Sequence, residues 1–297
     1  MTAPADPRLE AETPRPQRRP GPSVLRSPLM VVGLTVLGLL VFVAVFAPLL
    51  ATHDPKVVTG AALERPSARH WLGTNDSGRD LFSQLVYGTR VSLLVGSVGP
   101  SLALLGAVMI GVLPALIGGR VDRLSNRFVV FLLALPGLPL LVLIGALVGQ
   151  NQWAIIIVIA TGGIAPNARI LRAKALSLRE AGFISAARGF GGGPFYVLRR
   201  HFVPGLGPLI LVGFVTWAST AIALEAGLAF LGLGDPSGVS WGLMLERGLS
   251  QRSLYFSPMW TWWVLPPGIA ITIAVMSFTF VGVALEPTFN PRWLRSS

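Results

Sequence analysis

The chain alternates between long apolar runs and shorter polar segments. The apolar runs cover residues 28–50, 91–117, 128–149, 153–170, 206–233 and 259–285. About 20 residues of helix cross a bilayer, and each run is close to that length or longer. Because lipid offers no partner to exposed backbone N–H and C=O groups, such runs must be helical. The pattern therefore predicts an all-α integral membrane protein with six transmembrane helices.

Three polar segments stand out between and before these runs. Residues 1–27 are rich in Pro and Arg with little apolar content, which predicts a disordered N-terminal tail ahead of a transmembrane domain at 28–297. Residues 51–89 form a polar stretch before the second predicted span. Residues 168–204 form a long basic loop between the fourth and fifth spans.

Composition and charge support a membrane protein. The 297 residues are 52% hydrophobic and 12% charged, whereas a soluble domain is about 25% charged. The net charge of +11 would indicate a nucleic-acid partner in a soluble protein. Here the basic residues gather between apolar runs, so we expect no nucleic acid and contact with lipid instead. The absence of cysteine excludes disulfides and thiolate metal sites.

The distribution of Lys and Arg predicts the orientation. Six spans place both termini on one side, and that side holds 17 of the 24 Lys and Arg residues. Basic residues favour the cytoplasmic side, so both termini are expected there.

The long loop has a pattern of its own. Leu171, Ala175, Leu178 and Phe183 recur near helical spacing with arginines between them. The Gly-Gly-Gly-Pro run at 191–194 ends that helix, and a second short apolar and basic stretch follows. The small residues Ser185, Ala186 and Ala187 before the break would let another surface approach closely. The residues alone leave open a second interpretation, an amphipathic helix lying on the membrane surface.

The same loop resembles the EAA loop of bacterial ABC importer permeases. That loop has Glu-Ala-Ala, then a Gly after three residues, and later an apolar position before Leu-Pro. This chain has Ser185-Ala186-Ala187, then Gly191, then His201, Val203 and Pro204 at matching spacing. Ser185 replaces the glutamate, which removes any salt bridge made there but keeps the helix–turn–helix pattern.

Six further segments are similar to the second permease type of the dipeptide/oligopeptide/nickel transport family. In chain order they are HWLGTNDSGRDLFSQLVYGTRVSLLVG (70–96), GGRVDRLSNR (118–127), LALPG (133–137), EAGLAFLGLG (225–234), SWGLML (240–245) and NPRW (290–293). The family usually has Asp where this chain has Asn290. The resemblance covers nearly everything after the tail.

The resemblance implies a type I permease fold in the bacterial plasma membrane and a set of partners. These are two ATP-binding subunits, a second permease subunit and an extracytoplasmic substrate-binding protein. It also implies that residues 179–191 form a coupling helix held by an ATPase subunit, with contact through Ser185, Ala186, Ala187, Arg188 and Gly191. ATP and magnesium are expected on the partner subunits, because no Gly-Lys pair exists here and a P-loop is impossible.

Candidate pathway residues lie in the fifth span. Glu225 is an acid within an apolar run, where a charge is costly and usually faces protein or water. Trp217 and Ser219 lie near it in sequence and could line a cavity. The alternatives are that Glu225 pairs with an Arg or caps a helix near the membrane surface, and that Ser219 packs between helices.

Other polar residues favour structural roles. Asp76, Arg79 and Asp80 are expected to form ion pairs that fix the segment before the second span. His70 has no second ligand at metal-binding spacing, so we interpret it as structural. Pro136 and Pro139 predict a kink in the third span, either tolerated by the bundle or shaping a pathway.

Two other function classes fit less well. An intramembrane enzyme would need convergent catalytic groups, and the spans hold no HExxH motif, no paired Asp and no histidine. An ATP-independent channel or carrier would not need the long loop. Among importers, nickel transport remains an alternative, and the absence of a His- or Met-rich cluster favours peptides.

Overall fold

The computed structural model describes residues 27–191 and 193–286, with the backbone alone for residues 185–188, 194, 195 and 198. Residues 1–26 of the predicted tail and the NPRW motif at 290–293 lie outside the described residues. Ser27, the last tail residue, caps the first helix, because its Oγ accepts a hydrogen bond from the Met30 N–H at 3.2 Å.

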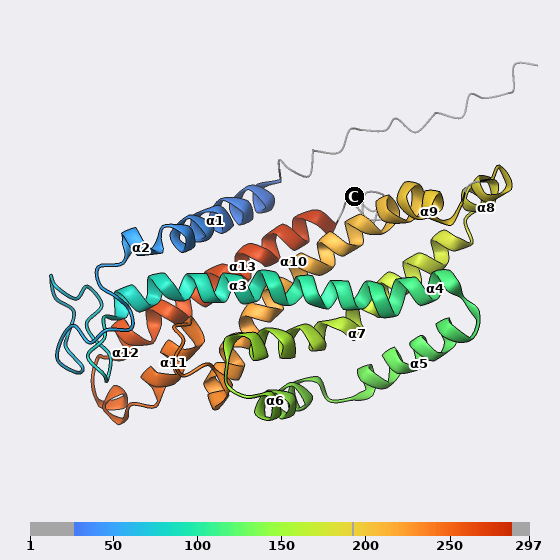
Figure 1. The fold of residues 1–297 in the computed structure, drawn as a ribbon. Coiled ribbons are helices and arrows are strands. Elements are labelled where there is room, and N and C mark those ends of the chain that lie inside the picture. The colour runs from blue at the N-terminus through green and yellow to red at the C-terminus, as the bar shows by residue number, and fades with distance from the viewer. Residues whose placement is uncertain (1–26, 192, 287–297) are drawn as a thin grey trace, which may run out of the picture.

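The described part of the chain is helical (Figure 1). The first half comprises α1 (Pro28–Val45), α2 (Ala47–Leu50), α3 (Leu81–Ala107), the π-helical turn η3 (Val108–Val112), α4 (Leu113–Ile117), α5 (Gly119–Ala134), α6 (Gly137–Val148) and α7 (Gln152–Arg179). The second half comprises α8 (Gly182–Gly189), α9 (Pro194–Val197), η4 (Leu198–Phe202), α10 (Val203–Leu228), η5 (Ala229–Leu233), α11 (Trp241–Leu249), η6 (Arg252–Phe256), α12 (Trp260–Trp263) and α13 (Leu265–Leu285).

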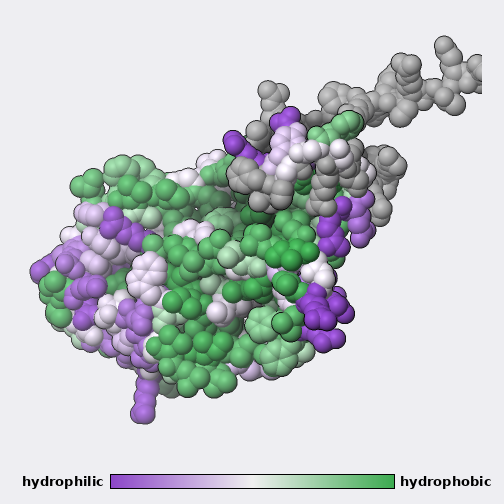
Figure 2. Space-filling view, turned by 45° about the vertical axis from the view of Figure 1, so that its right-hand side comes forward, coloured by the Kyte–Doolittle hydropathy of each residue, from purple (hydrophilic) through white to green (hydrophobic). Residues whose placement is uncertain are grey.

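Five helical stretches are long and apolar enough to cross a membrane, and a sixth span is present if α5 and α6 count as one broken span. The predicted all-α membrane fold is therefore confirmed. In Figure 2 a hydrophobic band separates two hydrophilic ends of the molecule. We call these the α8 end, which carries α8 and α9, and the α11 end, which carries α11 and residues 51–80 (Figure 1).

The second span begins earlier than hydropathy predicted, at Leu81 rather than at residue 91. The Asp80 side chain caps this helix by accepting a hydrogen bond from the Ser83 N–H at 2.8 Å. The first three turns bury polar side chains, among them Gln84 and Thr89. Polar residues with partners inside the protein extend α3 at its N-terminal end, before the apolar run begins. The start of the apolar run is therefore later than the start of the helix.

The third span is not one kinked helix, so that prediction was wrong. α5 and α6 are separate helices that meet at an angle of 93°. Pro136 is the N-cap of α6, and Pro139 lies in the first turn, where no intrahelical N–H is needed. The prolines therefore begin a new helix instead of bending a continuous one.

Helices cross closely where glycine removes a side chain. A Cβ added to Gly111 in η3 would lie 2.6 Å from the Ala168 carbonyl oxygen and 2.9 Å from the Ala168 Cα in α7. A Cβ on Gly96 in α3 would lie 2.9 Å from the side chain of Ile222 in α10. Since lipid supplies no hydrophobic force between helices, such close backbone contact is a main source of packing energy.

We expect Gly111→Ala to destabilise the protein by about 1–3 kcal/mol, the usual range for overpacking. The new methyl group would meet backbone atoms of Ala168, which no rotamer change can move. Thermal unfolding in detergent should show a lowered Tm.

Gly99→Ala is the matched control, because its Cβ would lie an ordinary 3.6 Å from the Ile159 Cγ2. Both substitutions add the helix propensity of alanine, so the difference between them isolates the clash. Equal Tm values for the two variants would contradict the proposed close crossing.

Candidate functional site

The long loop forms the helix, break and helix that its pattern predicted. α7 continues to Arg179, a short turn follows, and α8 runs over Gly182–Gly189. Gly191 has a φ of +83°, a conformation that favours glycine, and α9 begins at Pro194. α8 lies at one extremity of the bundle, with α9 beside it (Figure 1).

Buried side chains attach α8 to the bundle. Ile184 of α8, Val197 of α9 and Phe202 of η4 are each at most 2% exposed and share one apolar cluster with Leu171 of α7. Because this packing is dense, a displacement of α8 has to be shared by α7 and the start of α10.

Polar contacts hold the same end of α7. Arg172 pairs with Asp122 of α5 through two hydrogen bonds, Nε to Oδ1 at 2.8 Å and Nη2 to Oδ2 at 2.9 Å. Arg179 donates from Nη1 to the Ala115 carbonyl of α4 at 2.7 Å. Arg179, which we expected in the coupling helix, therefore belongs to the bundle, and α8 starts after it.

The surface around α8 is aromatic and basic. Phe183, Phe190 and Tyr196 are 53%, 93% and 54% exposed, and Arg199 and Arg200 are also exposed. Large exposed aromatic side chains grouped outside the apolar band are typical of a protein contact. We call these five residues the α8 surface.

The predicted contact residues Ser185, Ala186, Ala187 and Arg188 lie within α8, and their side chains lie outside the described residues. Gly191 follows the helix directly. A Cβ added to Gly191 would have no atom within 4 Å, so the space beside it is open. The backbone therefore presents this stretch at the tip of the molecule without intramolecular cover at Gly191.

Glu225 is buried within α10 and is 2% exposed. It lines a small cavity with Val91 of α3, Gln152 of α7 and Ser240 before α11. Its Oε2 has no hydrogen-bond partner among the described residues. Glu225 faces the interior of the protein. The structure therefore does not support the alternative in which Glu225 caps a helix or pairs with an Arg near the membrane surface.

A second cavity of about 360 Å³ adjoins this one at the α11 end, and Gln152 and Asp235 line both. Its wall also carries Asp54, Lys56 and Arg90. Burial would raise the pKa of Asp235, but hydrogen bonds from Ser237, from Gln152 and from the Gly238 N–H hold it below its usual value. The cavity next to the one that holds Glu225 is therefore lined by side chains of both charges.

The other two pathway candidates face elsewhere. Trp217 contacts Gly163 of α7, and its indole Nε1 is buried without a partner among the described residues. Ser219 lines a groove between α10 and α13, and its Oγ donates to the Thr216 carbonyl at 2.8 Å. The structure does not bring Glu225, Trp217 and Ser219 together.

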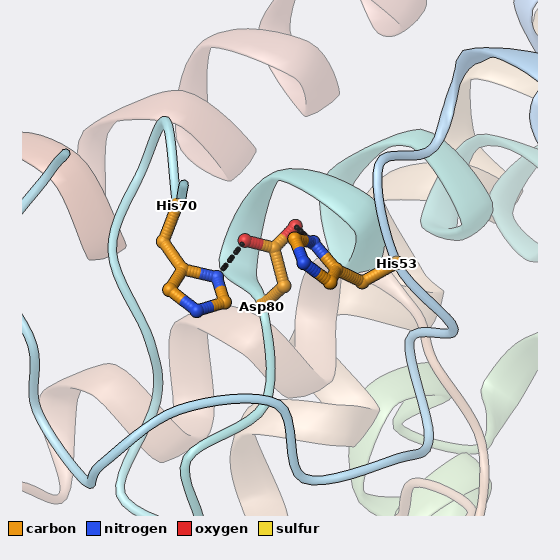
Figure 3. A group of neighbouring side chains, drawn as sticks. All are labelled: His53, His70 and Asp80. Carbon is orange, nitrogen blue, oxygen red and sulfur yellow. Dashed lines mark hydrogen bonds and ion pairs between the residues drawn. The ribbon is translucent and has the colours of Figure 1, made fainter. Parts of the chain in front are cut away.

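Residues 51–80 close the α11 end with a polar cluster that the sequence did not reveal (Figure 3). His53, His70 and Asp80 meet there, so His70 has a second histidine beside it. Within the described chain only Asp80 of the three expected ion-pairing residues forms such a pair, while Asp76 and Arg79 form none. Sequence spacing missed His53, because a loop rather than a regular element places it.

These features define a class, a polytopic helical membrane protein with an anchored helix exposed at one end. A family model for the inner membrane component of binding-protein-dependent transport systems matches residues 107–295, and a model for the N-terminal transmembrane domain of oligopeptide transport permease C matches residues 24–68. The chain belongs to this family of transport permeases, as the resemblance implied. This family is one of transporters and not of enzymes.

Named relatives cover almost the whole chain. A peptide permease protein of Brucella suis is 35% identical over 93% of this chain and 91% of its own length. A dipeptide transport system permease protein of Alkalihalophilus pseudofirmus is 34% identical over 93% and 90%. An oligopeptide transport system permease protein of Bacillus subtilis is 32% identical over 89% and 86%.

We expect Glu225→Gln to lower solute uptake by about tenfold or more, because a hydrogen bond to a charged group contributes about 1.5–3 kcal/mol. The substitution keeps the shape of the side chain and replaces the carboxyl group with an amide that cannot ionise. Uptake into cells, normalised to the amount of protein in the membrane, is the measurement.

Glu246→Gln on α11 is the matched control, since Glu246 lines neither cavity and accepts a hydrogen bond from Ser250 near the surface. It should leave uptake within about twofold of the unmodified protein. Normal uptake by the Glu225 variant would exclude Glu225 from the pathway.

Proposed function

We propose that this chain is a permease subunit of an ATP-driven importer of di- or oligopeptides in the bacterial plasma membrane. Family membership supports a transport role, and the names of the relatives support peptides as cargo. The single observation that carries the energy-coupling part is α8, an exposed helix anchored to two long helices.

In this proposal both termini and α8 lie in the cytoplasm, as the bias of basic residues predicts. Two ATP-binding subunits hold ATP and magnesium, and one of these subunits binds the α8 surface. Closure of the ATPase pair moves α8, and the apolar cluster around Ile184 transmits that displacement to α7 and α10. A second permease subunit completes the pathway, and an extracytoplasmic binding protein delivers the peptide to the α11 end.

The cavities fit such cargo. A peptide backbone ends in one positive and one negative group, and the wall of the larger cavity carries Lys56 and Arg90 as well as Asp54 and Asp235. A cavity wall with charges of both signs stabilises a zwitterionic solute better than a solute that is only a cation or only an anion. Competition of dipeptides, longer peptides and nickel for uptake tests this assignment directly.

We expect Gly191→Arg to abolish stimulation of ATP hydrolysis by loaded binding protein and to lower uptake by more than about tenfold. The substitution places a bulky charged side chain in the open space next to α8, and it forces a non-glycine residue into a positive φ, which costs about 1–3 kcal/mol. Uptake and ATPase rates in proteoliposomes are the measurements.

Gly119→Arg is the matched control, because Gly119 also has a positive φ and open space around it but is the first residue of α5. Both variants carry the same backbone cost, and only one lies beside α8. Uptake lost equally in both variants, or retained in the Gly191 variant, would contradict the assignment of α8 as the coupling helix.

A further inference from the structure

Two histidines and an aspartate converge where the polar segment 51–80 folds over the start of α3 (Figure 3). The Nδ1 of His70 lies 2.9 Å from the Asp80 Oδ1, and the Nδ1 of His53 lies 4.0 Å from the Asp80 Oδ2. One potential ligand atom from each residue lies within 4.8 Å of the others. The three side chains come from the α2–α3 connection and the N-cap of α3, so the fold of this segment builds the cluster.

The cluster is buried on one side and open on the other. The side chains of His70 and Asp80 are fully buried, whereas the side chain of His53 is 22% exposed. The two imidazole rings lie with their centroids 4.8 Å apart. A small ion could therefore enter past His53 and keep one position for water.

Hydrogen bonding leaves one buried atom of the cluster without a partner. With Nδ1–H of His70 donating to Asp80, the Nε2 of the same ring has no hydrogen-bond partner among the described residues, although it is fully buried. The Glu64 Oε2 lies 3.9 Å from this nitrogen. A buried polar atom without a partner costs about 1–3 kcal/mol and calls for a physical reason.

We propose that His53, His70 and Asp80 form a site for a divalent transition-metal ion of the zinc type. Two imidazole nitrogens and one carboxylate oxygen are ligands that such an ion prefers, and three protein ligands with one water complete a tetrahedron. Bond lengths of about 2.0–2.2 Å put tetrahedral ligand atoms on the order of 3.3 Å apart. The 2.9 Å between the His70 Nδ1 and the Asp80 Oδ1 is below that value, and the ligand atoms of all three residues lie within 4.8 Å of one another.

Metal binding also explains the unpartnered nitrogen. The ion takes the place of the proton between His70 Nδ1 and Asp80 Oδ1, and the neutral ring keeps one proton by carrying it on Nε2. That Nε2–H then points to the Glu64 carboxylate, which acts as the outer partner that metal-binding histidines usually have. Glu64 is held in place because its Oε1 accepts the Ala61 N–H at 2.7 Å.

The hydrogen bonds from Ser83 to Asp80 stay intact when the ion binds, because they end on the other carboxylate oxygen. Asp80 Oδ2 keeps its hydrogen bonds from the Ser83 N–H at 2.8 Å and the Ser83 hydroxyl at 2.7 Å. The ion would thus fasten the α2–α3 connection to the first turn of α3.

The test uses the full-length chain together with its co-purifying subunits in lipid nanodiscs. The chain carries an affinity tag that contains no histidine. After removal of metal with a chelator, Zn²⁺ is titrated by calorimetry, and Co²⁺ is added separately to report the ligand geometry by its visible absorption. We expect one Zn²⁺ per chain and the intense absorption of tetrahedral Co²⁺.

His53→Ala should weaken Zn²⁺ binding by more than about tenfold and remove the Co²⁺ absorption. This variant should fold, because His53 attaches to Ser83 through its backbone N–H at 3.0 Å and its side chain is partly exposed. Glu64→Gln should weaken binding while keeping the Co²⁺ absorption, since it alters only the outer partner.

His201→Ala is the matched control, as it removes a histidine at the α8 end and should leave binding unchanged. Absence of stoichiometric Zn²⁺ binding, or binding that His53→Ala and His201→Ala leave equally intact, would overturn the proposal. Uptake is not the readout, so failure here leaves the transport assignment untouched.

Discussion

Every backbone N–H and C=O group inside a bilayer must find its partner within the protein, and this constraint decides where the helices of this chain can break. At three of these breaks a long side chain from another element donates to a backbone carbonyl. Arg90 donates to the Val45 carbonyl at 3.1 Å where α1 gives way to α2, and Gln150 donates to the Gly232 carbonyl at 2.6 Å in η5. Arg179 does the same for Ala115 near the end of α4. These three side chains thus supply internal partners where regular helix ends.

The same constraint explains what the sequence could and could not predict. Long apolar runs have one solution in lipid, so the helical membrane fold and most spans followed from hydropathy. The start of α3 did not, because Asp80 and Gln84 satisfy their polar groups through tertiary contacts with His70 and Pro55 that no local pattern records. The separation of α5 from α6 depends on how far the chain turns at Pro136, and a proline in a sequence indicates a break without giving its angle.

The candidate sites divide in the same way. α8 was predictable because its small residues and the glycine run beside it form a local pattern. The separation of Glu225 from Trp217 and Ser219 could not be predicted, because residues a few positions apart on one helix face different neighbours. The histidine cluster was hidden for a further reason. His53 and His70 are brought together by a loop, and loop geometry leaves no periodic signal in the sequence.

The two ends of the molecule have different mechanical characters. At the α8 end, Ile184 packs α8 against α7, and the Asp122–Arg172 pair joins α7 to α5. At the α11 end, residues 51–80 and α11 cover cavities whose walls carry charge. An anchored, exposed helix at one end and charged cavities at the other are the two features on which the proposed transport function rests.

Labelling of position 190 tests the central claim, that α8 meets an ATPase subunit in the cytoplasm, most directly. The chain has no cysteine, so Phe190→Cys, at a position 93% exposed, and Trp71→Cys, at one 56% exposed, each introduce a single thiol at opposite ends. A membrane-impermeant maleimide should label position 71 in intact spheroplasts and position 190 only in inside-out vesicles, where an ATPase subunit should protect it. Labelling of position 190 from the outside would contradict the account.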